Sequence, residues 1–215
     1  MLIDLYLKGK EVAVFGGGNE AELKVLKVLD DGAKVTVVSK EFTSVLRQLA
    51  DDGRIRVIEY DLSDGFTSLK DRIGSPYVVF LATDDKAVNT EGTGFAKRLG
   101  AIVCVVDTPK LCDFAMPAIA KVGDVRIGVS TGGRSPVIAK LFRQRIERMF
   151  TTEDLLQLEL QEYARRKIRP RIGEFRSRKK FLWRVVENNE IQTMLKENKL
   201  DQAKNIVDRM IEQVF

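Results

Sequence analysis

The chain contains no histidine, only two cysteines and a single tryptophan among its 215 residues. Without histidine, the common zinc sites lose their imidazole ligands, and Cys104 and Cys112 alone cannot complete one. So few cysteines in a chain of this length are typical of the reducing cytoplasm rather than of a secreted domain held by disulfides. We therefore predict no metal site and a cytoplasmic location.

Long hydrophobic runs are also lacking, since none approaches the ~20 residues that a membrane span needs. The first six residues include an acid and no basic stretch, which argues against a secretory signal. Hydrophobic residues make up 44% of the chain, enough for one core and a smaller second one. The net charge of +5 suits an anionic ligand as well as nucleic acid.

One glycine-rich stretch organises the first half of the chain. Val12–Phe15 is apolar and predicts a short buried strand, and residues 20–29 have helical spacing. Between them lies the fingerprint Gly16-x-Gly18-x-x-Ala21 of a dinucleotide site. Gly16 permits the tight turn, Gly18 lets a pyrophosphate approach the backbone, and the helix N-terminus offers free N–H groups. The alternative is a glycine turn with a purely structural role.

The same strand–helix alternation continues to residue 106. We expect further strands at 33–38, 54–59, 77–81 and 101–106, with helices at 42–49, 66–72 and 86–99. Apolar strands that alternate with helices imply a parallel sheet covered on both faces. Ligands of such sheets bind at the carboxyl ends of the strands. The stretches Gly16–Gly18, Ala82–Asp85 and Asp107 should therefore converge on one crevice.

The end of the second strand, Ser39-Lys40, bears on the choice between NAD and NADP. NAD-binding domains of this type usually place an acid there to hold the ribose 2′-hydroxyl, and the nearest acid here is Glu41. Lys40 either favours a 2′-phosphate or is simply a solvated lysine. This local rule leaves the cofactor open.

The alternation breaks after Asp107. A strand is expected at 125–130, and a turn at 131–134 leads into a helix with Ser135 as its N-cap and Pro136 at its first position. The Gly132-Gly133 turn is either a second anion site or a plain connection. Beyond residue 150 only helices are expected, at 154–165, 181–187 and 200–214. We predict an α/β, Rossmann-like parallel-sheet domain over 1–150 and a smaller helical domain over 151–215.

Residues 165–184 contain ten basic residues against the single acid Glu174. Three interpretations remain: a solvated charged face, a surface for single-stranded nucleic acid, and a cationic wall for a polycarboxylate ligand. We assign Phe175, Phe181 and Trp183, which are interleaved with the charges, to helix packing. The sequence shows neither internal repeats nor low-complexity segments.

Five motifs occur together in order and spacing: Gly16-Gly-Gly-Asn-Glu-Ala-x-x-Lys24, Ala82-Thr-Asp-Asp85 with Asn89, Val105-Val-Asp-Thr-Pro109, Cys112-Asp-Phe-x-x-Pro117 and Ser130-Thr-Gly-Gly-x-Ser-Pro136. Together they resemble the precorrin-2 dehydrogenases, which comprise the N-terminal module of sirohaem synthase and its stand-alone relatives. The resemblance covers residues 2–148 well and the helical remainder more loosely.

The resemblance implies NAD⁺-dependent oxidation of precorrin-2, a tetrapyrrole, to sirohydrochlorin in sirohaem biosynthesis. Some relatives also insert Fe²⁺, and family enzymes are homodimers whose helical domains take part in dimerisation. It implies Asp107 as the catalytic residue. Cofactor-binding residues are expected to be Gly16, Gly17, Gly18, Asn19, Glu20, Ser39, Lys40, Ala82, Thr83, Asp84 and Asn89. Substrate-binding residues are expected to be Thr131, Gly132, Gly133, Ser135, Phe114, Arg176, Arg178 and Lys179.

The chain departs from the family at two places. Cys104 stands where asparagine is common, and Leu23-Lys24 replaces a common Arg-Lys. Neither change removes a proposed catalytic group, whereas the lack of histidine counts against iron insertion.

Two alternatives remain open. Asp107 is either a base at the strand end or a loop residue that caps backbone amides, and Asp113 is expected to be structural. The rival function is a non-catalytic NAD-sensing module whose basic segment binds nucleic acid. Nucleic acid is otherwise not an expected partner.

Overall fold

The structure is a computed structural model that describes residues 2–213. By its internal contacts the chain divides into two compact units, Met1–Met116 and Pro117–Phe215. The division falls earlier than the expected boundary at residue 150. The reason is that the β-hairpin and the long helix after residue 117 pack against each other rather than joining the main sheet. Each unit is described by itself.

The first unit contains a five-stranded sheet in the order β3-β2-β1-β4-β5, with every neighbouring pair parallel. The strands are β1 (Glu11–Phe15), β2 (Lys34–Ser39), β3 (Arg56–Glu59), β4 (Val78–Leu81) and β5 (Ile102–Val105). This topology confirms the Rossmann-like fold class. The strand order reverses between β1 and β4, which is where sheets of this kind bind their ligands.

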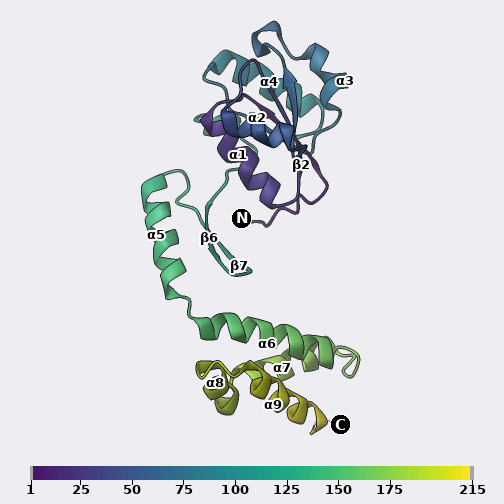
Figure 1. The fold of residues 1–215 in the computed structure, drawn as a ribbon, viewed down its shortest axis with the longest axis vertical. Coiled ribbons are helices and arrows are strands. Elements are labelled where there is room, and N and C mark those ends of the chain that lie inside the picture. Colours follow the sequence, from purple (N-terminus) through teal and green to yellow (C-terminus); the bar gives the residue numbers. More distant parts are fainter. Residues whose placement is uncertain (1, 214–215) are drawn as a thin grey trace. The chain divides into compact units, whose positions relative to one another are not determined.

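Both faces of the sheet are covered, as the apolar strands predicted. On one face Val12 and Val14 pack against Val25 of α1 and Leu46 of α2. On the other face the residues that alternate with them pack against α4 and the segment before it. The helices α1 and α2 therefore lie on one side of the sheet and α3 and α4 on the other (Figure 1). Their bounds are α1 (Asn19–Asp30), α2 (Ser44–Asp51), α3 (Lys70–Ile73) and α4 (Lys86–Arg98).

The second unit begins with an antiparallel hairpin, β6 (Ala118–Val122) and β7 (Val125–Val129), followed by α5 (Pro136–Met149). The sequence predicted β7 but not β6, whose five residues directly follow a proline-containing loop. The helix start is confirmed, because Ser135 caps α5 by accepting a hydrogen bond from the backbone N–H of Ile138 at 3.2 Å, and Pro136 is its first residue.

Four further helices, α6 (Thr152–Ile168), α7 (Phe175–Val186), α8 (Asn189–Lys196) and α9 (Leu200–Glu212), enclose a second core. Leu160, Phe181 and Ile211 are fully buried in it, and Figure 1 shows α6 lying over α7, α8 and α9. The helix α8 was not expected, and α7 begins six residues before the helix predicted at Phe181. None of the helices described in residues 2–213 is both long and apolar enough to cross a membrane.

The assignment of three aromatic residues to helix packing holds for only one of them. Phe181 is buried, but Phe175 is 71% exposed and Trp183 is 54% exposed. The helical period explains the difference, because Phe181 and Val185 face the core of the unit while Trp183 shares the outer face with the basic residues of α7.

Candidate dinucleotide site

The glycine turn after β1 has three residues with three different constraints. Gly16 has φ +114°, and a side chain there would collide with the carbonyl oxygen of Ala82 at the end of β4. A side chain on Gly17 would collide with the carbonyl oxygen of Glu41, just beyond β2. Gly18 is exposed and faces open space. The turn is therefore pinned between the ends of β2 and β4 and is open only at its third glycine.

This opening leads to the N-terminus of α1. Gly18 is the N-cap of the helix and no side chain caps it, so the first N–H groups of α1 remain available to a ligand. Asn19 and Glu20 are exposed in the first turn, and Glu20 pairs with Lys24 at 3.5 Å. Backbone donors at a helix N-terminus, next to a position without a side chain, fit the pyrophosphate of a dinucleotide.

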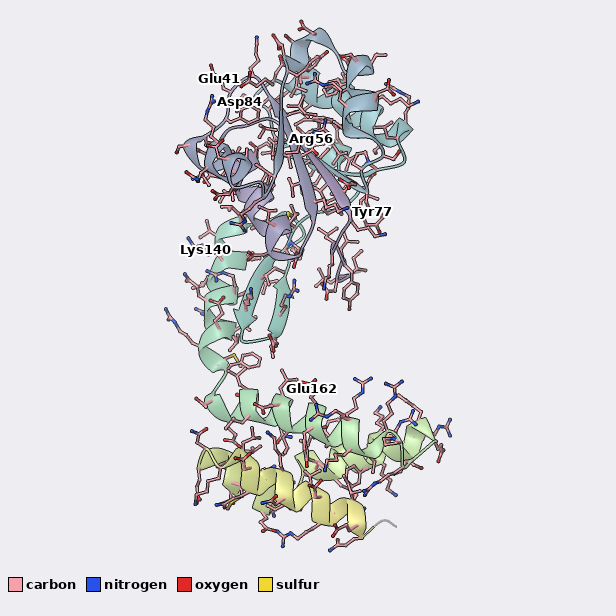
Figure 2. All side chains as sticks on the ribbon, turned by 45° about the vertical axis from the view of Figure 1, so that its right-hand side comes forward. Glu41, Arg56, Tyr77, Asp84, Lys140 and Glu162 are labelled. Atoms are coloured by element: carbon pink, nitrogen blue, oxygen red, sulfur yellow. The ribbon has the colours of Figure 1, made fainter. Side chains whose placement is uncertain are left out.

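The loop Ala82–Asp85 after β4 is held by a buried asparagine. The side-chain amide of Asn89 donates to the carbonyl oxygen of Thr83 at 2.9 Å and its oxygen accepts from the Thr83 hydroxyl at 2.8 Å. Asp85 caps α4 by accepting from the N–H groups of Ala87 and Val88. Asp84 is exposed, and Figure 2 shows it near Glu41 at one edge of the sheet, with Tyr77 at the opposite edge. The buried side chain of Asn89 therefore fixes the conformation of this loop.

The expected cofactor residues at the end of β2 also lie against the turn. The hydroxyl of Ser39 is close enough that a side chain on Gly17 would touch it. Lys40 follows, exposed, and forms an ion pair with Asp61, which lies just beyond β3. Asp61 is not among the expected cofactor residues, because the usual pattern places the ribose-binding acid at the end of β2. The signal was present, since β3 ends at the same edge of the sheet.

Asp107 lies just beyond β5, at this same edge. It is exposed and has φ +58°, a left-handed conformation that aspartate and asparagine tolerate better than most residues. Within residues 2–213 its carboxylate has no hydrogen-bond or ion-pair partner, so it does not cap the loop. β5 is two strands from β1, about 10 Å away at ~4.8 Å per strand.

Asp113, rather than Asp107, is the aspartate that stabilises this loop. Its carboxylate accepts a hydrogen bond from the backbone N–H of Val103 at 2.9 Å and pairs with Lys97 at 2.9 Å. The hydrogen bond from Lys97 holds the pKa of the Asp113 carboxyl below its usual range, against a small opposing effect of burial. The loop after Asp107 is therefore tied back to β5 at Asp113, as expected.

Of the two cysteines, Cys112 lies in this loop and Cys104 lies in β5. The thiol of Cys112 exchanges hydrogen bonds with the backbone N–H and carbonyl oxygen of Val105 at 3.1 and 3.2 Å. Burial raises the pKa of the Cys104 thiol to about 11, with a smaller contribution from Cys112. A protonated, buried thiol is a poor nucleophile, so Cys104 is structural. Cys112 is structural through its hydrogen bonds to the backbone of Val105.

A cavity of about 370 Å³ lies beside the same loop, lined by both cysteines, Pro109, Asp113 and Phe114. The Phe114 ring packs edge-on against Phe80 of β4, with ring centres 5.8 Å apart. Phe114, an expected substrate residue, is thus half-buried and belongs to the first unit together with Asp107.

The remaining expected substrate residues belong to the second unit. The hydroxyl of Thr131 accepts from the backbone N–H of Ser135 at 3.1 Å and donates to its carbonyl oxygen at 3.2 Å. Gly132 and Gly133 between them have φ +63° and +77°, with open space where a side chain would stand. The turn is closed by its own hydrogen bonds, and its two glycines leave one surface bare.

The basic residues of α7 differ in their surroundings. Arg176 and Lys179 are exposed. One guanidinium nitrogen of Arg178 donates to the carbonyl oxygens of Ile172 and Gly173 at 2.7 and 2.6 Å. Arg178 therefore fastens the loop between α6 and α7, a role that the sequence analysis did not assign to it.

Two protein families match parts of this chain. Residues 3–118 match the family described as "Putative NAD(P)-binding", and residues 123–149 match the family described as "Sirohaem biosynthesis protein central". The first match spans the whole parallel sheet, and the second spans β7 and α5. The first unit is an NAD(P)-binding domain.

The relatives define the family more narrowly. The chain is 33% identical over 188 residues to the precorrin-2 dehydrogenase of Methanosarcina barkeri, covering 87% of this chain and 83% of that protein. It is 39% identical over 189 residues to the siroheme synthase of Methylococcus capsulatus, covering 86% of this chain and 38% of that protein. The chain belongs to the precorrin-2 dehydrogenase family, and it spans less than half the length of the siroheme synthases that it matches.

A solved structure supports the fold. The protein titled "SirC, precorrin-2 dehydrogenase" matches with a TM-score of 0.73 over 97% of this chain and 99% of that one. The sequence identity is 19%, so this likeness concerns the fold alone.

Proposed function

We propose that the chain is a precorrin-2 dehydrogenase, which oxidises precorrin-2 to sirohydrochlorin with NAD⁺ as the hydride acceptor. The observation that carries the proposal is the position of Asp107. Its carboxylate, which has no partner among residues 2–213, lies at the strand edge that also holds the glycine turn, on the half of the sheet that follows the reversal of strand order. In folds of this type that half receives the nicotinamide end of the dinucleotide.

The glycine turn fits the dinucleotide. Gly16 and Gly17 keep the turn tight, and Gly18 with the first N–H groups of α1 would hold the pyrophosphate. The loop Ala82–Asp85 would contact the cofactor at the next strand, with Asn89 as the buried residue that positions it. When bound, NAD⁺ supplies the acceptor for the hydride.

Asp107 would accept the proton. Loss of a hydride leaves the macrocycle with one positive charge more, and a C–H or N–H proton must then leave to return the ring system to its original charge. The electron pair of that bond stays in the conjugated ring, and the proton goes to the carboxylate of Asp107. An exposed carboxylate without an internal partner can take up the proton and release it to water.

The expected substrate residues would supply apolar contacts in the first unit and cationic contacts in the second. In the first unit Phe114 offers a half-buried ring near the loop that carries Asp107. In the second unit the Gly132-Gly133 turn offers a surface bare of side chains, where the N–H of Gly132 already donates to the Ser130 hydroxyl at 3.3 Å. Arg176 and Lys179 would pair with peripheral carboxylates of the tetrapyrrole. We do not include Arg178 among the substrate-binding residues, because its guanidinium already donates to two backbone carbonyl oxygens.

We also propose a homodimer formed through α5. Alongside exposed basic residues, this helix exposes a set of large apolar side chains, with Val137 and Met149 75% and 74% exposed and Ile138, Leu141 and Phe142 also exposed. A surface helix normally shows polar residues on its outer face, so this stripe calls for a partner, and a second copy of the chain supplies one. A cytoplasmic location stays a prediction, supported by the free thiols of Cys104 and Cys112.

The direct test mixes the protein with NAD⁺ and precorrin-2 and records NADH formation together with the absorption spectrum of sirohydrochlorin. Stoichiometric appearance of both products supports the proposal. NAD⁺ binding without turnover, together with retention of single-stranded nucleic acid, would favour the NAD-sensing alternative. Within residues 2–213 no three metal-ligating side chains of His, Cys, Asp or Glu lie together, and the proposal covers dehydrogenation without iron insertion.

A further inference from the structure

A lysine and an aspartate face each other across the ends of β2 and β3. Lys40 directly follows β2 and its side chain is 67% exposed, whereas the side chain of Asp61, with which it pairs, is only 25% exposed. The two strand ends are joined by a hydrogen bond from the backbone N–H of Tyr60 to the carbonyl oxygen of Ser39 at 3.1 Å. The pair therefore sits on a fixed backbone rather than on two mobile loops.

Asp61 is fixed independently of the lysine. Its carboxylate accepts hydrogen bonds from the hydroxyl of Ser63 at 2.6 Å and from the backbone N–H of Ser63 at 3.0 Å. The hydrogen bond from Lys40, followed by those from Ser63, lowers the pKa of the Asp61 carboxyl to about 2. Asp61 is consequently a carboxylate at every pH at which the protein would work.

The surroundings of Lys40 are negative overall. Asp61, Asp64 and Glu41 all act on its ammonium group and raise its pKa. Three carboxylates against one ammonium leave a net negative charge at this strand end, which repels a phosphate.

This strand end belongs to the dinucleotide site. The residues from Ser39 to Glu41 lie so close to the glycine turn that a side chain on Gly17 would collide with them. In folds of this type, the residues at the end of the second strand recognise the adenosine ribose, either by its 2′-hydroxyl or by a 2′-phosphate. A lysine without a partner at this position would favour the 2′-phosphate of NADP⁺. A lysine whose ammonium group is paired with a fixed aspartate would not favour it.

We propose that Asp61 is a specificity-determining residue that makes the chain select NAD⁺ over NADP⁺. It does so by holding the ammonium group of Lys40 and by adding its own negative charge where a 2′-phosphate would have to stand. This inference rests on the dinucleotide site of the proposed function and on no step of the chemistry. An acid just beyond β3 thereby replaces the acid that is usual at the end of β2.

The test is a calorimetric titration of the full chain with NAD⁺ and with NADP⁺. The wild-type protein should bind NAD⁺ at least about tenfold more tightly. Asp61→Asn should tighten NADP⁺ binding by about three- to tenfold, the size typical of one partly exposed charged contact. NAD⁺ affinity should change less than about twofold, since the 2′-hydroxyl carries no charge. Asp71→Asn removes an exposed carboxylate of α3 and is the control for net charge.

A second variant tests the role of the lysine. In the wild-type background Lys40→Ala should leave NADP⁺ affinity nearly unchanged, because the ammonium group is engaged by Asp61. In the Asp61→Asn background the same change should cancel the gain, which gives a double-mutant cycle for the pair. The increase in NADP⁺ affinity caused by Asp61→Asn should also become smaller at high salt.

Several outcomes would overturn the inference. It fails if the wild-type protein binds both dinucleotides equally, if Asp61→Asn leaves their ratio unchanged, or if Asp71→Asn changes it as much. Absence of binding to either dinucleotide would overturn this inference and the cofactor assignment together. A shifted ratio in a protein that does not oxidise precorrin-2 would support the inference and contradict only the proposed reaction.

Discussion

The carboxylate of Asp113 accepts the backbone N–H of Val103 at 2.9 Å, so a loop residue closes back onto the strand that precedes it. The backbone N–H of Asp113 also donates to the carbonyl oxygen of Val103 at 2.8 Å. These two bonds fix the ends of the segment that contains Asp107 and leave the carboxylate of Asp107 unengaged. Two acids six residues apart thus have separable tasks, one in stability and one in chemistry.

Removing the Asp113 side chain should destabilise the first unit. Asp113→Ala leaves the buried N–H of Val103 without its acceptor, which typically costs about 1–3 kcal/mol. Amide hydrogen exchange at Val103 is the appropriate measurement, because the single tryptophan lies in the second unit and does not report on the first. Unchanged exchange protection at Val103 would contradict the structural role.

The contribution of the Asp113 charge should depend on pH. Its pKa is lowered in the folded chain, chiefly by Lys97, so the stabilisation is complete above the unfolded-state pKa near ~4 and is lost as pH falls through the folded-state pKa. The difference in stability between wild type and Asp113→Asn should therefore be present at neutral pH and vanish in stronger acid. Denaturation followed by circular dichroism at both pH values measures it. A difference that persists in acid would exclude the ionised carboxylate as its source.

Asp107→Asn should lower kcat without weakening the fold. Loss of a base that acts in the transition state typically costs ~10²–10⁴-fold. Asparagine tolerates the left-handed conformation at least as well as aspartate, so the melting temperature should not fall. Stopped-flow measurement of NADH formation, with NAD⁺ affinity measured in parallel, tests the prediction. If kcat is unchanged, the proton leaves to water and the enzyme acts mainly by positioning.

The first unit could be predicted in detail because its signals are local. Apolar runs, glycine turns and helical spacing between residues 11 and 106 correspond to the observed strands and helices, and the strand order follows the general pattern of such folds. The exposure of Gly18 and of the Asp107 carboxylate also agrees with what a ligand crevice requires.

Other features could not be predicted, for physical reasons. The strand β6 is short and gains its order from pairing with β7, which the sequence pattern does not reveal. The role of Arg178 depends on two carbonyl groups at the end of a loop, and the Lys40–Asp61 pair joins residues that are distant in sequence. Sequence patterns indicate which residue types are present, whereas these contacts depend on which backbone groups lack partners.

The three glycines of the turn should respond differently to substitution. Gly18→Asp should fold normally, because that position faces open space, and should abolish NAD⁺ binding by placing a carboxylate where the pyrophosphate would lie. Gly17→Ala should instead lower stability, since its new methyl group would meet the carbonyl oxygen of Glu41. Calorimetry and thermal melting separate the two effects. Unchanged NAD⁺ affinity in Gly18→Asp would show that the cofactor does not bind at this turn.

Substitutions of the basic residues of α7 should likewise affect either substrate binding or stability, depending on the residue. Arg176→Gln with Lys179→Gln should raise KM for precorrin-2 and leave the melting temperature and NAD⁺ affinity unchanged, because both side chains are exposed. Arg178→Gln should lower the stability of the second unit, since it removes bonds to Ile172 and Gly173. Trp183 fluorescence follows that unfolding. A flat KM in the double variant, with reduced retention of nucleic acid, would favour the NAD-sensing alternative.

The exposed stripe on α5 should set the oligomeric state. A charge placed among Val137, Leu141 and Phe142 would have to be desolvated in the dimer together with the nearby Arg145, which costs several kcal/mol, so Phe142→Glu should yield a monomer. Lys140→Glu is the matched control, because Lys140 is exposed on the same helix (Figure 2), and the helical period places it off the stripe. Sedimentation velocity over a range of concentrations measures both variants. If Phe142→Glu and wild type sediment alike as dimers, the interface lies elsewhere. If wild type is already a monomer, the stripe has a different partner, and the proposed homodimer is wrong.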